Sequence, residues 1–107
     1  MVKLFILTSG MMVVADEEIE NGKRVWNCPL QCQYEGIKVQ FKSLYHYIKG
    51  NSMSVRNAQI HIFLEAEAEP KLANHYHVAV EGFNAAKAGI VIPQMRPPEP
   101  KKIIGPN

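Results

Sequence analysis

Apolar and polar side chains alternate along much of residues 2–64, with the period of two that is typical of β-strands. The clearest case is the run of Ile37, Val39 and Phe41, whose intervening residues are polar. A strand of this kind buries one face and exposes the other. We expect extended runs at residues 2–8, 11–18, 23–28, 30–34, 37–41, 53–55 and 58–64. Because the runs on either side of Pro29 continue one another, the pattern predicts about five or six strands.

Turn-forming residues between these runs indicate how the strands connect. Asn21-Gly22 is the strongest hairpin signal, because both residues tolerate the positive φ of a type I′ turn. Pro29 has no N–H to donate, so we expect a bulge, an edge or a break there. We expect Trp26 and Phe41 in the core, since each stands among alternating or apolar neighbours. Short strands joined by tight turns favour a small barrel or a strongly bent sheet, because closure removes exposed strand edges.

At Glu69-Pro70 the period changes to that of an amphipathic helix. Proline suits the first helical position because its missing N–H is not needed there. Apolar side chains then recur every three or four residues, at Leu72, Tyr76, Val80 and Phe83. The pattern predicts a helix over about residues 70–86. The predicted fold class is therefore mainly β, with one helix towards the C-terminus.

The chain has 107 residues, which suits one domain with one core. We expect that domain to cover residues 1–92. Residues 93–107 hold five prolines and three cationic side chains, so we expect an extended or disordered tail. A domain of this size buries limited apolar surface, and self-association is a natural way to cover more of it.

The net charge of +2 is too small to indicate a nucleic-acid partner by itself, but the charges are unevenly distributed. Residues 36–64 contain no carboxylate and hold four cations, Lys38, Lys42, Lys49 and Arg56, whereas carboxylates cluster at 16–20 and 65–69. Within the carboxylate-free segment, Tyr45 and Tyr47 flank a histidine. Aromatic rings beside lysines are candidates for stacking on bases. The alternatives are a solvated surface for the charges, and packing in the barrel or at a subunit contact for both tyrosines.

The residue pattern does not predict an enzyme, a metal or a cofactor. His75 and His77 point about 200° apart on the predicted helix, so they cannot share a metal. Asp16 is the only aspartate, and neither a nucleophile elbow nor a glycine-rich phosphate loop occurs. Cys28 and Cys32 would lie about 13 Å apart on one strand, too far for a disulfide. Free thiols, with no signal or membrane-spanning run, favour a cytoplasmic protein with no membrane partner.

Two local patterns resemble the motifs of the Sm/LSm family. In the first, a strand and a turn that ends in Gly10 are followed by a small residue, Ala15, five positions later. The second motif runs as an aliphatic residue, Arg, usually Gly, two variable residues and another aliphatic residue. Here it is Val55-Arg56-Asn57-Ala58-Gln59-Ile60, with Asn at the position of the usual Gly. Asn tolerates left-handed backbone better than most residues. The overall layout, in which a helix follows the last strand, is similar to that of an Sm-like family carried by marine phages.

The resemblance implies an Sm-like (SH3-type) bent five-stranded antiparallel sheet or small barrel, and a homo-oligomeric ring of about five to seven subunits. It also implies a phage-infected bacterial cell as the location, and single-stranded RNA or DNA as a ligand at the pore face. The residues that the resemblance points to at that face are Asn21, Lys23, Arg24, Arg56 and Asn57. The charge pattern adds Tyr45 and Tyr47 as stacking candidates.

Two features of the chain depart from the family. Typical Sm proteins carry their helix at the N-terminus, and they place an Asp and then an Asn in the loop between strands two and three, where a base is held. Residues 20–24 lack that spacing. We therefore expect charge and stacking, rather than base-specific hydrogen bonds, to dominate any binding.

The alternative function is a structural or adaptor oligomer, such as a phage assembly component, that binds no nucleic acid. An enzyme is the third hypothesis. Convergence of Lys23, Arg24 and Arg56 on one exposed concave face would favour the nucleic-acid-binding ring. Scattered positions, or pairing of these cations with the acidic strand, would favour the structural oligomer.

Overall fold

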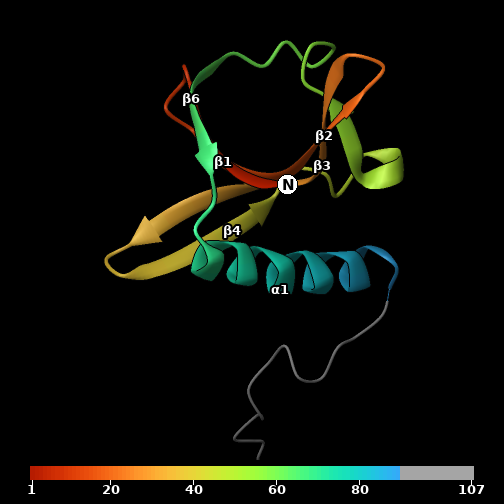
Figure 1. Ribbon diagram of the computed structural model, residues 1–107. Helices are drawn as coiled ribbons and strands as arrows, with labels where there is room; N and C mark the ends of the chain where they lie inside the picture. Colours follow the sequence, from red (N-terminus) through yellow and green to blue (C-terminus); the bar gives the residue numbers. More distant parts are fainter. Residues whose placement is uncertain (90–107) are drawn as a thin grey trace, which may run out of the picture.

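A bent antiparallel sheet lies over a single helix, and its two ends curl up on the side away from that helix (Figure 1). This computed structural model describes residues 1–89, so the predicted tail at 93–107 lies outside the described residues. The strands are β1 (Val2–Leu7), β2 (Met12–Glu20), β3 (Lys23–Glu35), β4 (Lys38–Ser43), β5 (Ser52–Ser54) and β6 (Ile62–Glu67). A 3₁₀ turn, η1 (Lys49–Asn51), precedes β5, and α1 (Pro70–Lys87) follows β6. The mainly β class with one helix after the last strand is confirmed.

The long strand β3 bends in its middle, and this bend divides the sheet. Cys28 has a positive φ of 49°, and the register between β3 and β2 shifts beside it. Pro29, which follows, cannot donate to a neighbouring strand. The sheet order is β4-β3-β2-β1-β6, with β5 beside the N-terminal half of β3 and β4 beside its C-terminal half. The irregularity predicted at Pro29 is confirmed, and the runs on either side of it form one strand.

Turn chemistry accounts for the hairpins on either side of β3. Asn21 and Gly22 have φ values of 53° and 76°, as a type I′ turn requires, so the predicted hairpin is confirmed. Ile37 was predicted on the buried face of a strand, and this is wrong: the side chain is fully exposed. The reason is that Ile37 belongs to the two-residue turn between β3 and β4.

The strand predicted over 58–64 starts later, at Ile62. The preceding residues form turns, because the carbonyl groups of Ser54 and Arg56 accept the N–H groups of Ala58 and Gln59. These local bonds take backbone groups that a strand would have given to its neighbours.

Alternation along β2 separates two cores, one on each face of the sheet. The helix-side core consists of Val14, Leu30, Cys32, Tyr45, Leu72 and Tyr76. The concave-side core consists of Phe5, Val13, Ala15, Trp26 and Val55. Trp26 is buried as predicted, with its ring centroid 4.3 Å from that of Phe5. Phe41 is only partly buried against the helix-side core, because β4 is an edge strand with a neighbour on one side.

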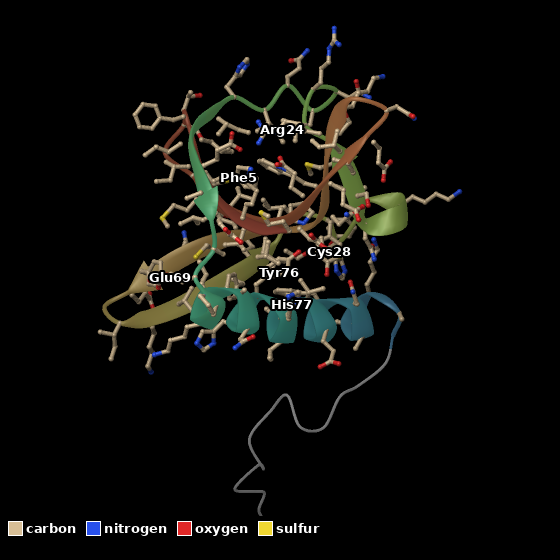
Figure 2. The ribbon with its side chains drawn as sticks, in the orientation of Figure 1. Phe5, Arg24, Cys28, Glu69, Tyr76 and His77 are labelled. Atoms are coloured by element: carbon tan, nitrogen blue, oxygen red, sulfur yellow. The ribbon has the colours of Figure 1, made fainter. Side chains whose placement is uncertain are left out.

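Helix α1 begins at Pro70 and turns its predicted apolar stripe to the helix-side core. The Tyr76 hydroxyl donates to the carbonyl oxygens of Asn27 (2.9 Å) and Cys28 (3.0 Å), at the bend of β3 (Figure 2). Burial raises the pKa of Tyr76, so this hydroxyl remains a donor at neutral pH. Helix and bend are thereby joined by a buried polar contact. Among residues 1–89, no helix is long and apolar enough to cross a membrane.

Replacing Tyr76 by Phe should destabilise the protein, because two carbonyl groups at the bend lose their shared donor. We expect the free energy of unfolding to fall by about 1–3 kcal/mol, measured by urea denaturation. Tyr34→Phe is the matched control, since Tyr34 is half exposed, and we expect its effect to stay within about 0.5 kcal/mol. Equal stability of both variants would show that the hydroxyl does not hold the bend.

Candidate nucleic-acid interface and the charged network beside it

The β2–β3 hairpin and the turn after β5 lie side by side at one end of the sheet (Figure 1). The N–H of Val55 donates to the carbonyl of Arg24 over 3.1 Å, which fixes the two segments together. This contact brings together four residues that the sequence predicted for nucleic acid, and all four are exposed: Asn21, Lys23, Arg56 and Asn57. We call these four residues the rim.

Two cations of the rim are open to a ligand. Within residues 1–89, neither Lys23 nor Arg56 takes part in an ion pair. Asn57 keeps its side chain exposed in the same turn. Two cations and two amides at one end of the sheet suit phosphate contacts and nonspecific hydrogen bonds.

Arg24 does not join the rim, which corrects the sequence-based expectation. Its side chain lies on the concave face, as that of Trp26 does two residues further along β3. There Nε donates to Glu17 Oε2 over 2.8 Å, and a terminal nitrogen donates to Glu65. The resemblance pointed to this residue at the pore-face loop, although the residue pattern already placed it in the strand over 23–28. Alternation along that strand decides which face its side chain takes. This is the pairing with the acidic strand that favours a structural role.

Tyr45 cannot stack on a base, because its side chain is completely buried in the helix-side core. Its hydroxyl donates to Asn84 Oδ1 over 2.6 Å, and its carbonyl accepts from Lys87 Nζ over 3.1 Å. Burial raises the pKa of this phenol. The proposal of Tyr45 as a stacking residue is therefore wrong, and packing in the fold, the alternative for this residue, is confirmed.

Tyr47, in contrast, is 96% exposed. The ring of His46 meets it edge-on, with the centroids 4.8 Å apart. The loop that carries both rings precedes β5, whereas Arg56 follows β5. The two candidate features thus stand at opposite ends of a strand, and the structure does not join them into one site.

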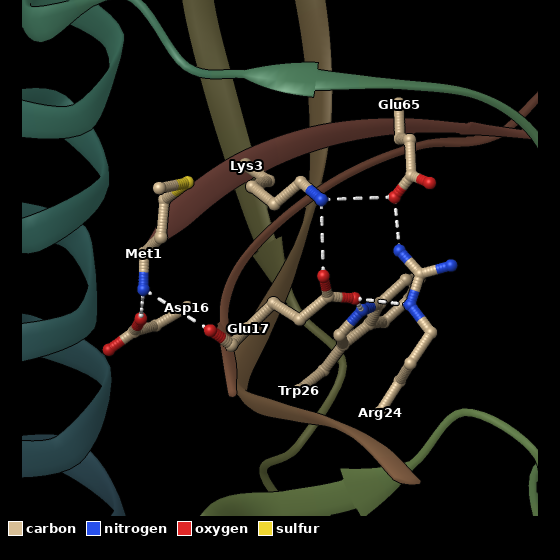
Figure 3. A network of polar contacts seen from close by, with 7 residues as sticks. All are labelled: Met1, Lys3, Asp16, Glu17, Arg24, Trp26 and Glu65. Carbon is tan, nitrogen blue, oxygen red and sulfur yellow. Dashed lines mark hydrogen bonds and ion pairs between the residues drawn. The ribbon is translucent and has the colours of Figure 1, made fainter. Parts of the chain in front are cut away.

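A charged network occupies the concave face beside the rim; it consists of Lys3, Glu17, Arg24 and Glu65 (Figure 3). Glu17 is the inner member, with only 7% of its side chain exposed. It accepts from Lys3 (3.2 Å), from Arg24 (2.8 Å) and from the indole N–H of Trp26 (3.0 Å). Glu65 accepts from Lys3 (3.1 Å) and from Arg24. Two carboxylates and two cations therefore alternate around a closed circuit.

The network favours the charged form of each member. Partial burial raises the pKa of Glu17, but hydrogen bonds from Arg24 and its other donors outweigh this effect and leave the pKa below its usual value. The hydrogen bond from Arg24 likewise lowers the pKa of Glu65. Burial lowers the pKa of Lys3, but bonds to Glu65 and Glu17 outweigh that and raise it.

The position of Glu17 in the alternating pattern of β2 could have indicated this network, although its residue type alone could not. Glu17 follows Val13 and Ala15 at the period of two, so it shares their concave face. A carboxylate on a core-facing row requires partners. Which partners it finds depends on the pairing of β1 with both β2 and β6, which brings Lys3 and Glu65 to the same place.

No family model matches this chain. A search of curated proteins found no match either. The candidate interface therefore rests on the geometry of its own residues.

No metal site is formed within residues 1–89, where no three His, Cys, Asp or Glu side chains come together in a way that could hold an ion. Both cysteines are free thiols in the structure, and Cys32 is buried. An open hollow of about 420 Å³ lies between the β1–β2 turn and the outer half of β3, lined by Gly10–Met12 and Gln31–Glu35. It contains no residue of the rim.

Stability should decrease as the pH falls, because the network lowers the pKa of Glu17 and Glu65 in the folded state. Carboxyls with depressed folded pKa values contribute stability above their unfolded pKa of about 4.5, and that contribution disappears as the pH falls through the folded pKa. Urea unfolding between about pH 6 and pH 3 measures this loss. Glu17→Gln should flatten the pH dependence, whereas Glu20→Gln, at an exposed position, should leave it unchanged. Parallel curves for wild type and Glu17→Gln would contradict the assignment.

Proposed function

We propose that this protein is a self-assembling, Sm-like ring component whose copies join through the edges of the sheet. The observation that carries the proposal is the pair of open edges. Within residues 1–89, β6 is hydrogen-bonded only to β1 at one edge, and β4 and β5 are each bonded only to β3 at the other. An open edge is a row of unpaired N–H and C=O groups that can pair with another chain. Because the two edges differ, their pairing is head-to-tail, and a head-to-tail contact that closes forms a ring.

The side chains of β6 support its use as a contact. Phe63 and Leu64, next to each other in this strand, are 70% and 54% exposed. The register with β1 skips Phe63, and both large apolar side chains are left exposed beside the open edge. Large apolar side chains gathered on an edge strand favour a protein–protein contact over permanent exposure to water.

Charge complementarity supports the same pairing. β6 exposes Glu67, while β4 exposes Lys38 and Lys42. Opposite charges along two edges guide their register and their encounter. The Sm resemblance agrees with this arrangement, since Sm-like relatives cover their edges by pairing the last strands of neighbours. The turn of the first Sm-like motif is consistent with the same resemblance, since Gly10 there has a positive φ of 93°, which glycine adopts without steric cost.

In dilute buffer the protein should sediment as a species several times the mass of one chain. The double variant Phe63→Lys with Leu64→Lys should shift it towards the monomer, because two charges disfavour burial of this strand. Val78→Lys is the matched control, since Val78 is equally exposed but lies on α1, and it should leave the assembly intact. A wild-type monomer at micromolar concentration would overturn both the ring and the Sm-like assignment.

Binding of single-stranded RNA or DNA at the rim is the second candidate function. The observation that favours it is the exposure of Lys23 and Arg56 at one end of the sheet, without ion pairs in the described part of the chain. In a ring these cations repeat with the symmetry, so a modest charge per chain becomes a continuous positive band. Loops around a narrow opening admit unstacked bases but exclude a duplex.

Binding to short fluorescent RNA and DNA oligomers, measured by anisotropy, should be weakly sequence-selective. It should weaken steeply between about 50 and 200 mM salt, because phosphate neutralisation releases counterions. Lys23→Ala with Arg56→Ala should weaken binding to all sequences alike. Lys49→Ala with Lys71→Ala removes the same charge from exposed positions outside the rim and should have a smaller effect. Absence of binding at low salt would leave the structural or adaptor function alone.

A further inference from the structure

The charged network joins two strands that the backbone does not join. Arg24 comes from β3 and Glu65 from β6, which are not neighbours in the sheet. Their side chains nevertheless meet across the concave face (Figure 3). The contact therefore spans β2 and β1 and joins the inner strand β3 to the edge strand β6.

We infer that Glu65 is a positioning residue for assembly: it fixes the edge strand β6 in the place where the next copy binds. This inference rests on the proposed function, because it assigns a role to the strand through which the copies join. In the described part of the chain, β6 has a hydrogen-bonded neighbour on one side only, and its register with β1 is irregular between Ile6 and Leu7. Backbone hydrogen bonds hold β6 to β1. We infer that the distance between β6 and β3 across the concave face is set by side-chain contacts.

The surroundings of the network allow its ion pairs to act on this curl. Lys3 Nζ and the Arg24 guanidinium lie 5.7 Å and 5.8 Å from the centroid of the Phe5 ring. Phe5 in turn packs against Trp26. The two ion pairs that share the nearly buried Glu17 are therefore screened less by water than pairs on an open surface. Glu65 is more exposed, at 38%, and it is held by contacts with both of these sheltered cations.

Charge balance makes Glu65 the member on which the bridge depends. Glu17 pairs with the same two cations, but it comes from β2, inside the sheet. If Glu65 loses its charge, Lys3 and Arg24 keep Glu17 as a partner. No ion pair of the network then includes a residue of β6. The interior strands then keep both ion pairs to Glu17, with one positive charge left over, while β6 loses its ion pair with β3.

The chain supplies a matched control within the same strand. Glu67 stands two residues after Glu65, on the same face of β6, and it is opposite Lys3 in the register of β1 with β6. Within residues 1–89 it makes no ion pair. Glu65→Gln and Glu67→Gln thus remove the same charge from the same strand, and only the first breaks the bridge.

The experiment compares these two variants with the wild-type chain by hydrogen exchange and by sedimentation. For Glu65→Gln, amides of residues 62–67 should exchange several-fold faster while those of α1 keep wild-type protection, and the assembled species should dissociate at a higher protein concentration. Glu67→Gln should match the wild type in the exchange of residues 62–67, and it serves as the control for that measurement. The control for sedimentation is Glu20→Gln, because this exposed carboxylate lies on β2, away from both sheet edges, and it should assemble like the wild type. Arg24→Gln should also speed exchange in residues 62–67, and it removes the bond to Glu17 in addition. The double variant should be less damaging than the sum of the two single changes, because both remove the same Arg24–Glu65 contact.

The two readouts separate this inference from the proposed function. Faster exchange in β6 together with weakened assembly supports both. Faster exchange in β6 with unchanged assembly shows that Glu65 positions the strand but that copies do not join through it, which overturns assembly through β6. Exchange in β6 equal to that of Glu67→Gln overturns the positioning role, even if assembly through the edges is observed.

Discussion

The bend of β3 at Cys28 and Pro29 is the constraint on which the rest of the structure depends. A straight strand of this length would have one partner along each side, but the bent strand takes β5 along one half and β4 along the other. Tyr76 holds the bend through the carbonyl groups of Asn27 and Cys28, so the helix and the curvature support each other. The curled sheet then creates a sheltered concave face, and only on such a face can cations and carboxylates from four strands meet.

Local chemistry made much of this fold predictable. The hairpin at Asn21-Gly22, the irregularity at Pro29 and the helix that begins at Pro70 each depend on a backbone property of one or two residues. Such properties act within a few positions along the chain and can be recognised without knowing the tertiary structure. The same is true of the burial of Trp26, whose strand neighbours already indicate a core-facing row.

The candidate site was less predictable, because contacts between residues far apart in the sequence decide which of its members are buried and which are exposed. Tyr45 and Tyr47 look alike in the sequence, yet one is buried and the other exposed. What separates them is contact with Asn84 and Lys87, about forty residues further along the chain, at the far end of a helix whose docking no local pattern specifies. Arg24 was placed with the rim on the Sm resemblance, although the predicted strand already began at Lys23, as β3 does. Alternation turns its side chain to the concave face, and its partners Glu17 and Glu65 come from strands that no local pattern pairs with it.

The division between Lys23 and Arg24 also bears on function. These neighbours in β3 point to opposite faces, so one cation is presented at the rim and the other is used within the charged network. At the rim, a single copy offers two cations, Lys23 and Arg56, for phosphate contacts. Two are too few for firm binding, since the affinity of such contacts grows with the number of phosphates neutralised. Nucleic-acid binding at the rim would thus require assembly, because only repetition around a ring multiplies these two cations. The proposed assembly, in contrast, would need no nucleic acid, since the sheet edges left open within residues 1–89 are present in every copy. Self-association would then come first, and any ligand at the rim would depend on it.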